Sequence, residues 1–335
     1  MSIALGHKDP MPAAVPAGMP DDAVVVRGLN KTYRAKSGTA VQALVDIDLA
    51  IPRGSLYGLL GPNGAGKSTL INILAQLVIK TSGTAAIWGI DLDRNPRAAA
   101  AAIGVVPQEL NIDPFFTPRE LLELQAGLYG VPKAERRTME ILDAVGLADK
   151  SEAYARTLSG GMRRRLMVAK ALVHTPPVLV LDEPTAGVDV ELRQQLWSYV
   201  RKLNAAGTTV LLTTHYLEEA EELCDRIAII NHGRVIACEP TAVLLRRLDS
   251  KELVFILEED LATVPSPLGR FDAQLQSPRR LMLRYQPSRT RIGEILAAVQ
   301  ASGIAIVDMT TLEADLEDIF LQLTRRDTAG AGHAA

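Results

Sequence analysis

The feature that most constrains this chain is a glycine-rich loop at residues 61–69. The loop reads GPNGAGKST and matches the phosphate-binding pattern G-x-x-x-x-G-K-[S/T] at every fixed position. An apolar run at 56–60 precedes it and an apolar-periodic segment at 70–77 follows it, which is the strand–loop–helix context that the pattern requires. Glycines let backbone N–H groups turn around an anion, and a helix start adds partial positive charge. The sequence therefore predicts a nucleoside triphosphate site rather than a glycine-rich turn with a chance lysine.

Length and composition exclude several kinds of protein. At 335 residues the chain can hold one large domain and a smaller one. The formal net charge of −3 gives no basic character that would favour nucleic acid. Cys224 and Cys238 form no disulfide framework and no metal-ligand spacing, which suits a reducing compartment. No segment reaches the roughly 18 consecutive apolar residues that span a bilayer. We therefore expect any membrane role to depend on a partner.

The pattern of strands and helices predicts an α/β fold with a P-loop NTPase core. Four short, continuously apolar runs are typical of a mainly parallel sheet buried on both faces; they lie at 56–60, 103–106, 178–181 and 209–213. Two earlier segments, 24–29 and 43–51, predict N-terminal antiparallel strands joined by a hairpin around 36–38. The residues at 231–233 predict another hairpin turn, so His232 is interpreted as a turn residue.

Further patterns divide the chain into domains. Thr117 and Glu120 predict a capping box that opens a helical stretch to about residue 145. This insertion between two strands predicts a helical subdomain within the core. Beyond residue 245 the pattern predicts a small α+β domain that closes with a helix at 312–323. The proline-rich N-terminus is interpreted as a disordered tail and not as a signal peptide. The predicted units are a tail at 1–22, a nucleotide-binding domain at 23–245 with its helical subdomain at about 112–172, the α+β domain at 246–326, and a tail at 327–335.

Polar residues follow the predicted parallel strands at the point where each strand ends. These residues are the glycine-rich loop itself, Gln108, the pair Asp182 and Glu183, and His215. Ligands of open α/β sheets bind beyond the carboxyl ends of the strands, so we expect these groups to converge on one edge. A carboxylate at the end of a buried strand suits Mg²⁺, and the next carboxylate suits a general base. The alternatives are two ordinary loop carboxylates and a packed or capping histidine.

A second glycine motif, LSGGM at 158–162, precedes a strongly helical run. Serine and glycines at a helix start form an anion site, although the motif alone is also explained as a plain helix cap. A second anion site about a hundred residues from the first indicates a site shared between two subunits. The following arginines, 163–165, are interpreted as a solvated helix face, and so are the glutamates at 218, 219, 221 and 222.

Taken in order, these motifs resemble the ATP-binding subunits of ABC transporters, over about residues 23–240. The segments PQELNIDPFFTPRELLELQAGLYGV and LTTHYLEEAEELCDRIAIINHGR resemble the ABC-2-type exporter subgroup of drug-resistance, nodulation and polysaccharide exporters. Met162 departs from the family pattern, where many members have glutamine. The matching motifs are an aromatic loop at Tyr33, Walker A at 61–69, a Q-loop at Gln108, the signature at 158–162, Walker B at 178–182, Glu183, a D-loop at 186–189 and the switch His215.

The resemblance implies that ATP and Mg²⁺ are the cofactors and assigns roles to residues. Tyr33 would stack on adenine, unless it is a core aromatic at a strand end. Ser68, Gln108 and Asp182 would serve Mg²⁺, Glu183 would polarise the attacking water, and His215 would contact the γ-phosphate. From a second copy, Ser159, Gly160 and Gly161 would close the site, with Asp189 in the D-loop. The implied loop contacts to ATP are Gly61, Pro62, Asn63, Gly64, Ala65, Gly66, Lys67, Ser68 and Thr69, together with Gln108.

The resemblance also implies the partners. They are a second copy in a head-to-tail dimer that encloses ATP, and a separate membrane-spanning permease that holds the chain at the cytoplasmic face of the membrane. Export is favoured by the subgroup. A soluble ABC-class ATPase acting on ribosomes or nucleic acid is the alternative, but the single ATPase domain, the lack of a coiled-coil insertion and the acidic charge oppose it. A GTPase or kinase would leave the second glycine motif and His215 without a role.

Overall fold

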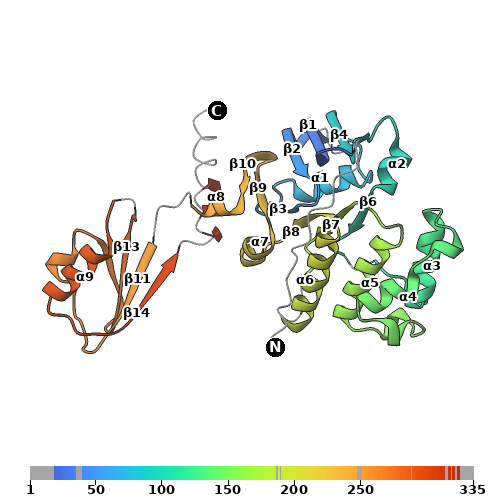
Figure 1. The fold of residues 1–335 in the computed structure, drawn as a ribbon. Coiled ribbons are helices and arrows are strands. Elements are labelled where there is room, and N and C mark those ends of the chain that lie inside the picture. Colours follow the sequence, from blue (N-terminus) through green and yellow to red (C-terminus); the bar gives the residue numbers. More distant parts are fainter. Residues whose placement is uncertain are drawn as a thin grey trace, which may run out of the picture.

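The computed structural model describes residues 19–34, 40–109, 111–185, 188, 190–246, 251–287 and 289–313, together with 316, 317, 319, 320, 323 and 324. Its strands form three sheets, and Figure 1 shows two of them close together and the third at the far end of the molecule. The predicted hairpin turn at 36–38 and both predicted tails lie largely outside the described residues.

The central sheet has six strands in the order β10-β9-β3-β8-β7-β6. All neighbours run parallel except the edge strand β10, which is antiparallel to β9. Every residue of β3, β7 and β8 is buried, which explains their continuously apolar sequences. The predicted α/β class with a mainly parallel sheet is confirmed. The strands are β3 (Leu56–Leu60), β6 (Ile103–Val106), β7 (Val178–Asp182), β8 (Thr209–Thr213), β9 (Arg226–Asn231) and β10 (Arg234–Pro240).

An N-terminal sheet of order β2-β1-β4-β5 packs over one face of the central sheet. Helix α1 (Lys67–Leu74) lies between the two sheets, because Leu70 and Leu74 share an apolar cluster with Val24 of β1 and Tyr57 of β3. A short helix, α2 (Pro96–Ala101), leads into β6. The strands of this sheet are β1 (Asp22–Arg34), β2 (Ala40–Pro52), β4 (Ser82–Ile87) and β5 (Ile90–Asp91).

A helical subdomain is inserted between β6 and β7 (Figure 1). It begins at the predicted capping box, in which Thr117 Oγ1 accepts the N–H of Glu120 and the Glu120 carboxylate accepts the N–H of Thr117. Its last helix has two apolar faces: Leu166 packs within the subdomain, whereas Val168 packs against the central sheet. The elements are α3 (Pro118–Leu128), η1 (Lys133–Glu135), α4 (Thr138–Ala144), η2 (Ala148–Lys150), η3 (Ala155–Thr157) and α5 (Gly160–Leu172).

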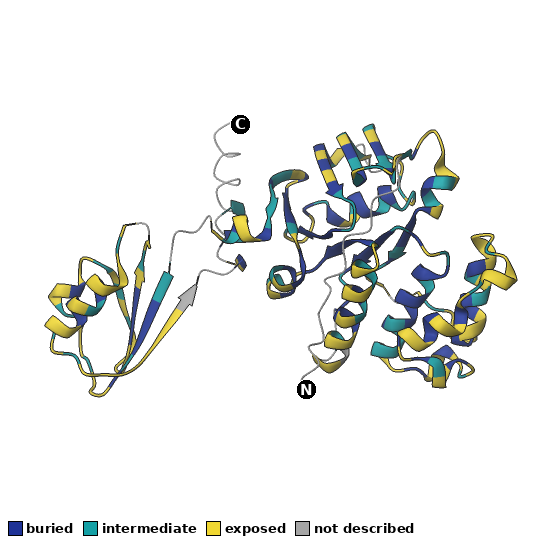
Figure 2. Cartoon of the chain, viewed as in Figure 1, coloured by how far each residue is buried: buried dark blue, intermediate teal, exposed yellow. Residues whose placement is uncertain are grey.

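The opposite face of the central sheet carries α6 (Val190–Ala205), α7 (Leu217–Leu223) and α8 (Thr241–Leu245). Burial follows these layers: in Figure 2 the central strands are dark blue, and the outward faces of the helices are yellow. None of the described helices combines the length and the apolar character that crossing a membrane requires.

Beyond α8 the chain forms a third, antiparallel sheet of order β12-β13-β11-β14. Helix α9 (Ile292–Ala301) covers one face, with Ile295 and Val299 packed on Leu253 and Phe255. The remaining elements are β11 (Lys251–Leu257), η4 (Ser266–Leu268), β12 (Asp272–Ser277), β13 (Arg280–Tyr285) and β14 (Ile306–Glu313).

The C-terminal segment differs from the sequence-based expectation. The helix predicted from residue 312 starts later, because β14 continues in register with β11 as far as Glu313. Leu316 and Ile319 are then buried in the apolar cluster of α6 and α7, and the Leu316 N–H donates to the Glu221 carboxylate at 3.3 Å. These residues therefore pack on α6 and α7, although their sequence neighbours belong to the third sheet.

Candidate nucleotide-binding site

The phosphate loop (residues 61–69) connects β3 to α1 through positions that only glycine fills without strain. A Cβ atom on Gly61 would lie 2.2 Å from a carbonyl oxygen of β9. Gly66 has φ +113°, and its Cβ would lie 2.7 Å from the carbonyl oxygen of Ala43. By contrast, Gly64 has φ +78° with open space around it. The loop is therefore packed tightly against β2 and β9 on one side and open on the other.

A turn distant in sequence supports the loop. The residues between β9 and β10 form the predicted hairpin turn, with positive φ at His232 and Gly233. The Gly233 N–H donates to the carbonyl of Ala65 at 2.9 Å, and its own carbonyl accepts the N–H of Val45 at 2.8 Å. The sequence predicted only the turn, because its contact with the phosphate loop depends on the order of strands in the sheet.

Lys67 begins α1 and is only 7% exposed. Its ammonium group donates to the carbonyls of Gly61 at 2.6 Å and Pro62 at 3.2 Å. These bonds link the start of α1 to the first two residues of the loop. Burial lowers the pKa of Lys67, and the nearby charges of Glu183 and Asp182 oppose that shift. None of the described side chains caps α1, so its first backbone N–H groups remain free for an anion.

Asp182 ends β7 and is 8% exposed. Burial raises its pKa, opposed chiefly by the hydrogen bond that the Thr213 hydroxyl donates to Oδ1. The same hydroxyl accepts the N–H of Glu183 at 3.0 Å. Thr213, at the end of the neighbouring strand β8, thus fixes both carboxylate residues, a role that its sequence position alone does not reveal.

Glu183 contacts side chains that follow two other strands of the central sheet. Its Oε2 accepts the amide N–H of Gln108 at 2.7 Å and lies 3.5 Å from Nδ1 of His215. Glu183 has φ +47°, a strained backbone conformation for a residue with a side chain. The His215 side chain is half exposed and packs on the ring of Tyr216. The structure therefore brings together the groups that follow β6, β7 and β8.

Gln108 and Glu183, together with the phosphate loop, line a cavity of about 400 Å³. Among its lining residues are Lys67, Ser68, Gln108 and Glu183, and the buried Asp182 interacts with Lys67 and Ser68. The described residues hold no cluster of three His, Cys, Asp or Glu side chains that would enclose a metal. One carboxylate, one hydroxyl and one amide oxygen instead fit Mg²⁺, which retains waters and shares phosphate oxygens with its nucleotide. The dimensions and the donor set fit a nucleoside triphosphate with its metal.

Several predicted site residues do not line this cavity, among them His215, which lies next to Glu183. Tyr33, near the end of β1, is 40% exposed, which rules out a core aromatic, but it is not among the described residues that line the cavity. Ser159 caps α5 through its Oγ, which accepts the N–H of Met162 at 3.2 Å, and both Ser159 and Gly160 are exposed on the helical subdomain. The predicted D-loop residue Asp189 lies outside the described residues.

The prediction of a solvated face for the arginines of α5 is wrong for Arg164. This side chain is 5% exposed, and its Nη1 donates to the carbonyl of Pro107 at 2.9 Å, directly before Gln108. Burial lowers its pKa, and the charges of Asp182 and Glu183 oppose the shift. Arg164 therefore connects α5 to the segment that carries Gln108.

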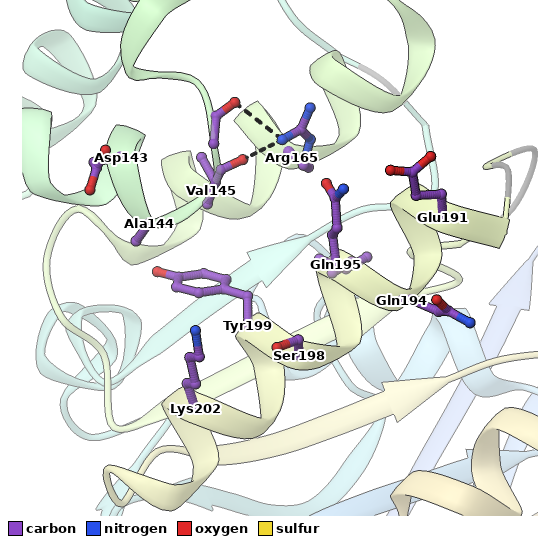
Figure 3. Close-up of a pocket in the computed structure, with 12 residues that line it drawn as sticks. Asp143, Ala144, Val145, Arg165, Glu191, Gln194, Gln195, Ser198, Tyr199 and Lys202 are labelled. Carbon is purple, nitrogen blue, oxygen red and sulfur yellow. Dashed lines mark hydrogen bonds between the residues drawn. The ribbon is translucent and has the colours of Figure 1, made fainter.

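Arg165 points to the other side of α5. Its guanidinium donates to the carbonyls of Val145 and Gly146 at the end of α4, and it borders a second cavity of about 460 Å³ between α4 and α6 (Figure 3). Tyr199 of α6 projects into that cavity and packs against both neighbouring apolar clusters. This cavity lies where the helical subdomain meets α6.

The glutamates of α7 also depart from the predicted solvated face. Glu218 and Glu222 are exposed as expected, but Glu219 is only 6% exposed. Its carboxylate accepts hydroxyl hydrogen bonds from Thr185 and Thr214. Sequence pattern did not separate Glu219 from its neighbours, because its hydrogen-bond partners lie in the segments that follow β7 and β8.

Comparison with known proteins connects this geometry to a family. The model of the ABC transporter family matches residues 44–186. The daunorubicin/doxorubicin resistance ATP-binding protein of Streptomyces peucetius is 39% identical over 313 residues, which cover 91% of this chain and 93% of that protein. The Nod factor export ATP-binding protein I of Ralstonia nicotianae is 35% identical and covers 90% of this chain and 94% of its own length. The chain belongs to the ABC transporter family.

Solved structures support the same family. A dimeric ATP-binding cassette in a post-hydrolysis state, bound to ADP and phosphate, is 30% identical with a TM-score of 0.60, over 65% of this chain and 98% of that one. This ABC transporter chain is an ATP-binding and ATP-hydrolysing subunit, as its resemblance predicted. The relatives do not favour the alternative of an ATPase that acts on ribosomes or nucleic acid.

Proposed function

We propose that this ABC subunit hydrolyses ATP at a composite site built from two copies of the chain and thereby drives export through a separate permease. The observation that carries the proposal is the separation of two anion-binding motifs. The phosphate loop opens into a cavity, whereas Ser159 and Gly160 are exposed on the helical subdomain, away from that cavity. A second copy, placed head to tail, would bring its own Ser159–Gly161 segment over the γ-phosphate.

Within one copy, the phosphate loop and Lys67 hold the β- and γ-phosphates, and Tyr33 stacks on the adenine from near the end of β1. Ser68, Asp182 and Gln108 would hold Mg²⁺, which would neutralise phosphate charge. The buried position of Asp182 supports this assignment, since a metal offsets the cost of burying its charge.

Glu183 is the general base in this proposal. Its carboxylate already accepts one hydrogen bond, from Gln108, and lies near His215, so it has a defined orientation at the mouth of the cavity. From there it would accept a proton from the attacking water, while His215 contacts the γ-phosphate. The partner's Ser159, Gly160 and Gly161 supply hydroxyl and backbone N–H groups to the charge that develops on phosphate, so hydrolysis requires the dimer. Asp189 would lie at the dimer contact.

The permease contact is proposed at a groove between the central sheet and the helical subdomain. This groove, of about 220 Å³, is lined by Leu77, Tyr129 and Met167, and its floor reaches Asp182. Leu77 is 75% exposed at its rim. A helix of a membrane subunit seated there would contact both units that Arg164 connects. Such a partner would hold the chain at the cytoplasmic face of the membrane. The export direction rests on relatives that are named for drug resistance and Nod factor export.

The decisive experiment replaces the proposed base. Glu183→Gln is expected to keep ATP affinity and to lower kcat by about 10²- to 10⁴-fold, because the amide cannot accept the proton. It is also expected to accumulate as an ATP-bound dimer, measured by sedimentation with and without ATP. The control is Glu222→Gln, an exposed glutamate of α7 that pairs with Arg201 on the surface. Wild-type hydrolysis by Glu183→Gln, or a monomer in saturating ATP, contradicts the proposal.

A further inference from the structure

Glu219 is a buried acid to which the proposed chemistry gives no role. It lies in the first turn of α7, where an acidic residue ordinarily stabilises the helix through the dipole while remaining solvated. Glu218, its neighbour, is exposed and serves that purpose. Glu219 is instead 6% exposed, and removing a carboxylate from water is costly unless its oxygens find donors. The identity of those donors indicates what Glu219 does.

One oxygen of Glu219 joins two segments of the proposed active site. Its Oε2 accepts the Thr185 hydroxyl at 3.0 Å and the Thr214 hydroxyl at 2.9 Å, and both threonines are fully buried. Thr185 lies two residues after Glu183, and Thr214 directly precedes His215. Thr214 Oγ1 also accepts the N–H of Tyr216, which fixes the loop on the other side of the histidine.

The strained backbone at Glu183 requires such an anchor. A positive φ on a residue with a side chain persists only where its surroundings hold it. On its N-terminal side Glu183 is held by its N–H, which bonds to the carbonyl of Thr213 at 3.1 Å and to the hydroxyl of the same residue. Beyond Glu183, the hydrogen bond from Thr185 to Glu219 holds the segment that leads away from the strained residue.

The second oxygen of Glu219 faces α6. Its Oε1 lies 3.4 Å from Nε of Arg193, and the Arg193 guanidinium also stacks on the ring of Tyr216, 4.6 Å from its centroid. The helix that carries Arg193 begins at Val190, directly after the predicted D-loop. The carboxylate therefore has short hydrogen bonds to the segments of Glu183 and His215 and a longer ionic contact to the helix behind the D-loop.

We infer that Glu219 is a positioning residue that keeps Glu183 and His215 at the separation hydrolysis requires, through Thr185 and Thr214. This inference rests on the proposed roles of Glu183 and His215. Glu219 is buried and is not among the described residues that line the cavity, so it would act through the two threonines. Its loss should therefore affect the rate of hydrolysis and leave the phosphate loop, more than a hundred residues away in sequence, able to bind ATP.

The test compares Glu219→Ala with Glu222→Ala, an exposed position on the same helix. Steady-state ATPase assays give kcat and KM, titration of a fluorescent ATP analogue gives affinity, and ¹H–¹⁵N spectra of the histidine rings report on His215, assigned by its loss in His215→Asn. We expect Glu219→Ala to lower kcat by about 10- to 100-fold, as befits the partial loss of a general acid–base arrangement. Nucleotide affinity should stay within about 3-fold, and the ring signals of His215 should shift.

Conservative variants separate positioning from general structural support. Glu219→Gln retains an oxygen that can accept both hydroxyls and is expected to recover most of the lost kcat. Thr214→Val, which keeps the shape but removes one donor, is expected to shift the His215 signals in the same direction as Glu219→Ala. Equal losses of kcat and nucleotide affinity in Glu219→Ala, or unshifted His215 signals, overturn the inference.

The same experiment distinguishes this inference from the proposed function. If Glu183→Gln abolishes hydrolysis while Glu219→Ala retains the wild-type kcat, the positioning role is wrong and the general base stands. If Glu183→Gln hydrolyses ATP normally, the proposed function fails on its own, whatever Glu219→Ala does.

Discussion

The phosphate loop and the start of α5 are both proposed to bind anions, but they differ in the burial and the charge of their side chains. Around the phosphate loop the chain buries Lys67 and Asp182, and the buried Arg164 interacts with the charges of Asp182 and Glu183. At the start of α5, Ser159 and Gly160 are exposed and offer a hydroxyl and backbone N–H groups without a charged side chain. The first region is thus an enclosed, charged half-site, and the second is an open, neutral one.

This difference shows what each half requires from its ligand. Burial disfavours the charged forms of Lys67, Asp182 and Arg164. Because phosphate and metal charges would offset this cost, their binding is expected to stabilise the enclosed half most. The open half has little to gain from a free anion in water, because exposed donors are already solvated. In the proposed dimer it becomes effective only when a second copy covers it. The proposal therefore assigns ATP affinity mainly to the enclosed half and hydrolysis to the open half.

The largest expected effect comes from blocking the open half. Ser159→Arg places a bulky side chain where the partner's γ-phosphate is proposed to lie, and kcat is expected to fall by about 10²- to 10³-fold, as when oxyanion donors are removed. ATP affinity of the single copy should be unchanged. In the Glu183→Gln background, Ser159→Arg should abolish the ATP-dependent dimer in sedimentation. Asp149→Arg adds the same side chain at an exposed position of the helical subdomain and is the control. A Ser159→Arg variant that loses ATP affinity would contradict the division between the halves.

The next effect comes from the enclosed half. Lys67→Ala removes a buried ammonium group proposed to contact phosphate, and charge-assisted hydrogen bonds contribute about 1.5–3 kcal/mol. The Kd for ATP is therefore expected to rise by about 10- to 100-fold, measured by calorimetric titration. Lys133→Ala, at an exposed position of η1, serves as the matched control. An unchanged Kd in Lys67→Ala would mean that the phosphate loop does not bind ATP as proposed.

The sequence predicted the enclosed half well because its motifs are local. The strand ends before Gly61, Gln108, Asp182 and His215 are apolar runs, and parallel strands must align their carboxyl ends. Their common edge was therefore predictable without coordinates. The capping box at Thr117 was predictable for the same reason, since both of its partners lie within one helical turn.

The misinterpreted residues are those whose surroundings come from distant segments. Arg164 lies in a run of three arginines and Glu219 in a run of glutamates, and such runs are ordinarily solvated. Arg164 is buried because α5 packs across the end of β6, and Glu219 because threonines of two strand ends face α7. Helical periodicity identifies which face of a helix is apolar, but it does not identify a charged residue that finds buried donors on another element.

The smallest expected effect tests whether the enclosed half carries an electrostatic cost. Because burial raises the pKa of Asp182, folding favours its protonated form. Protonated Asp182 makes its full contribution to folding stability below the unfolded-state pKa of about 3.9. That contribution is lost as the pH rises through the folded-state pKa. Asp182→Asn is therefore expected to raise the Tm of the nucleotide-free protein at neutral pH, while it weakens Mg²⁺-dependent hydrolysis. The difference in Tm between Asp182→Asn and wild type should shrink as the pH falls toward 4, in thermal unfolding measured at several pH values.

Asp93→Asn, which alters an exposed partner of Lys80, should show no such pH-dependent gain in Tm. If Asp182→Asn is less stable than wild type at neutral pH, the carboxylate is stabilising without its metal, and the enclosed half would not depend on ligand charge.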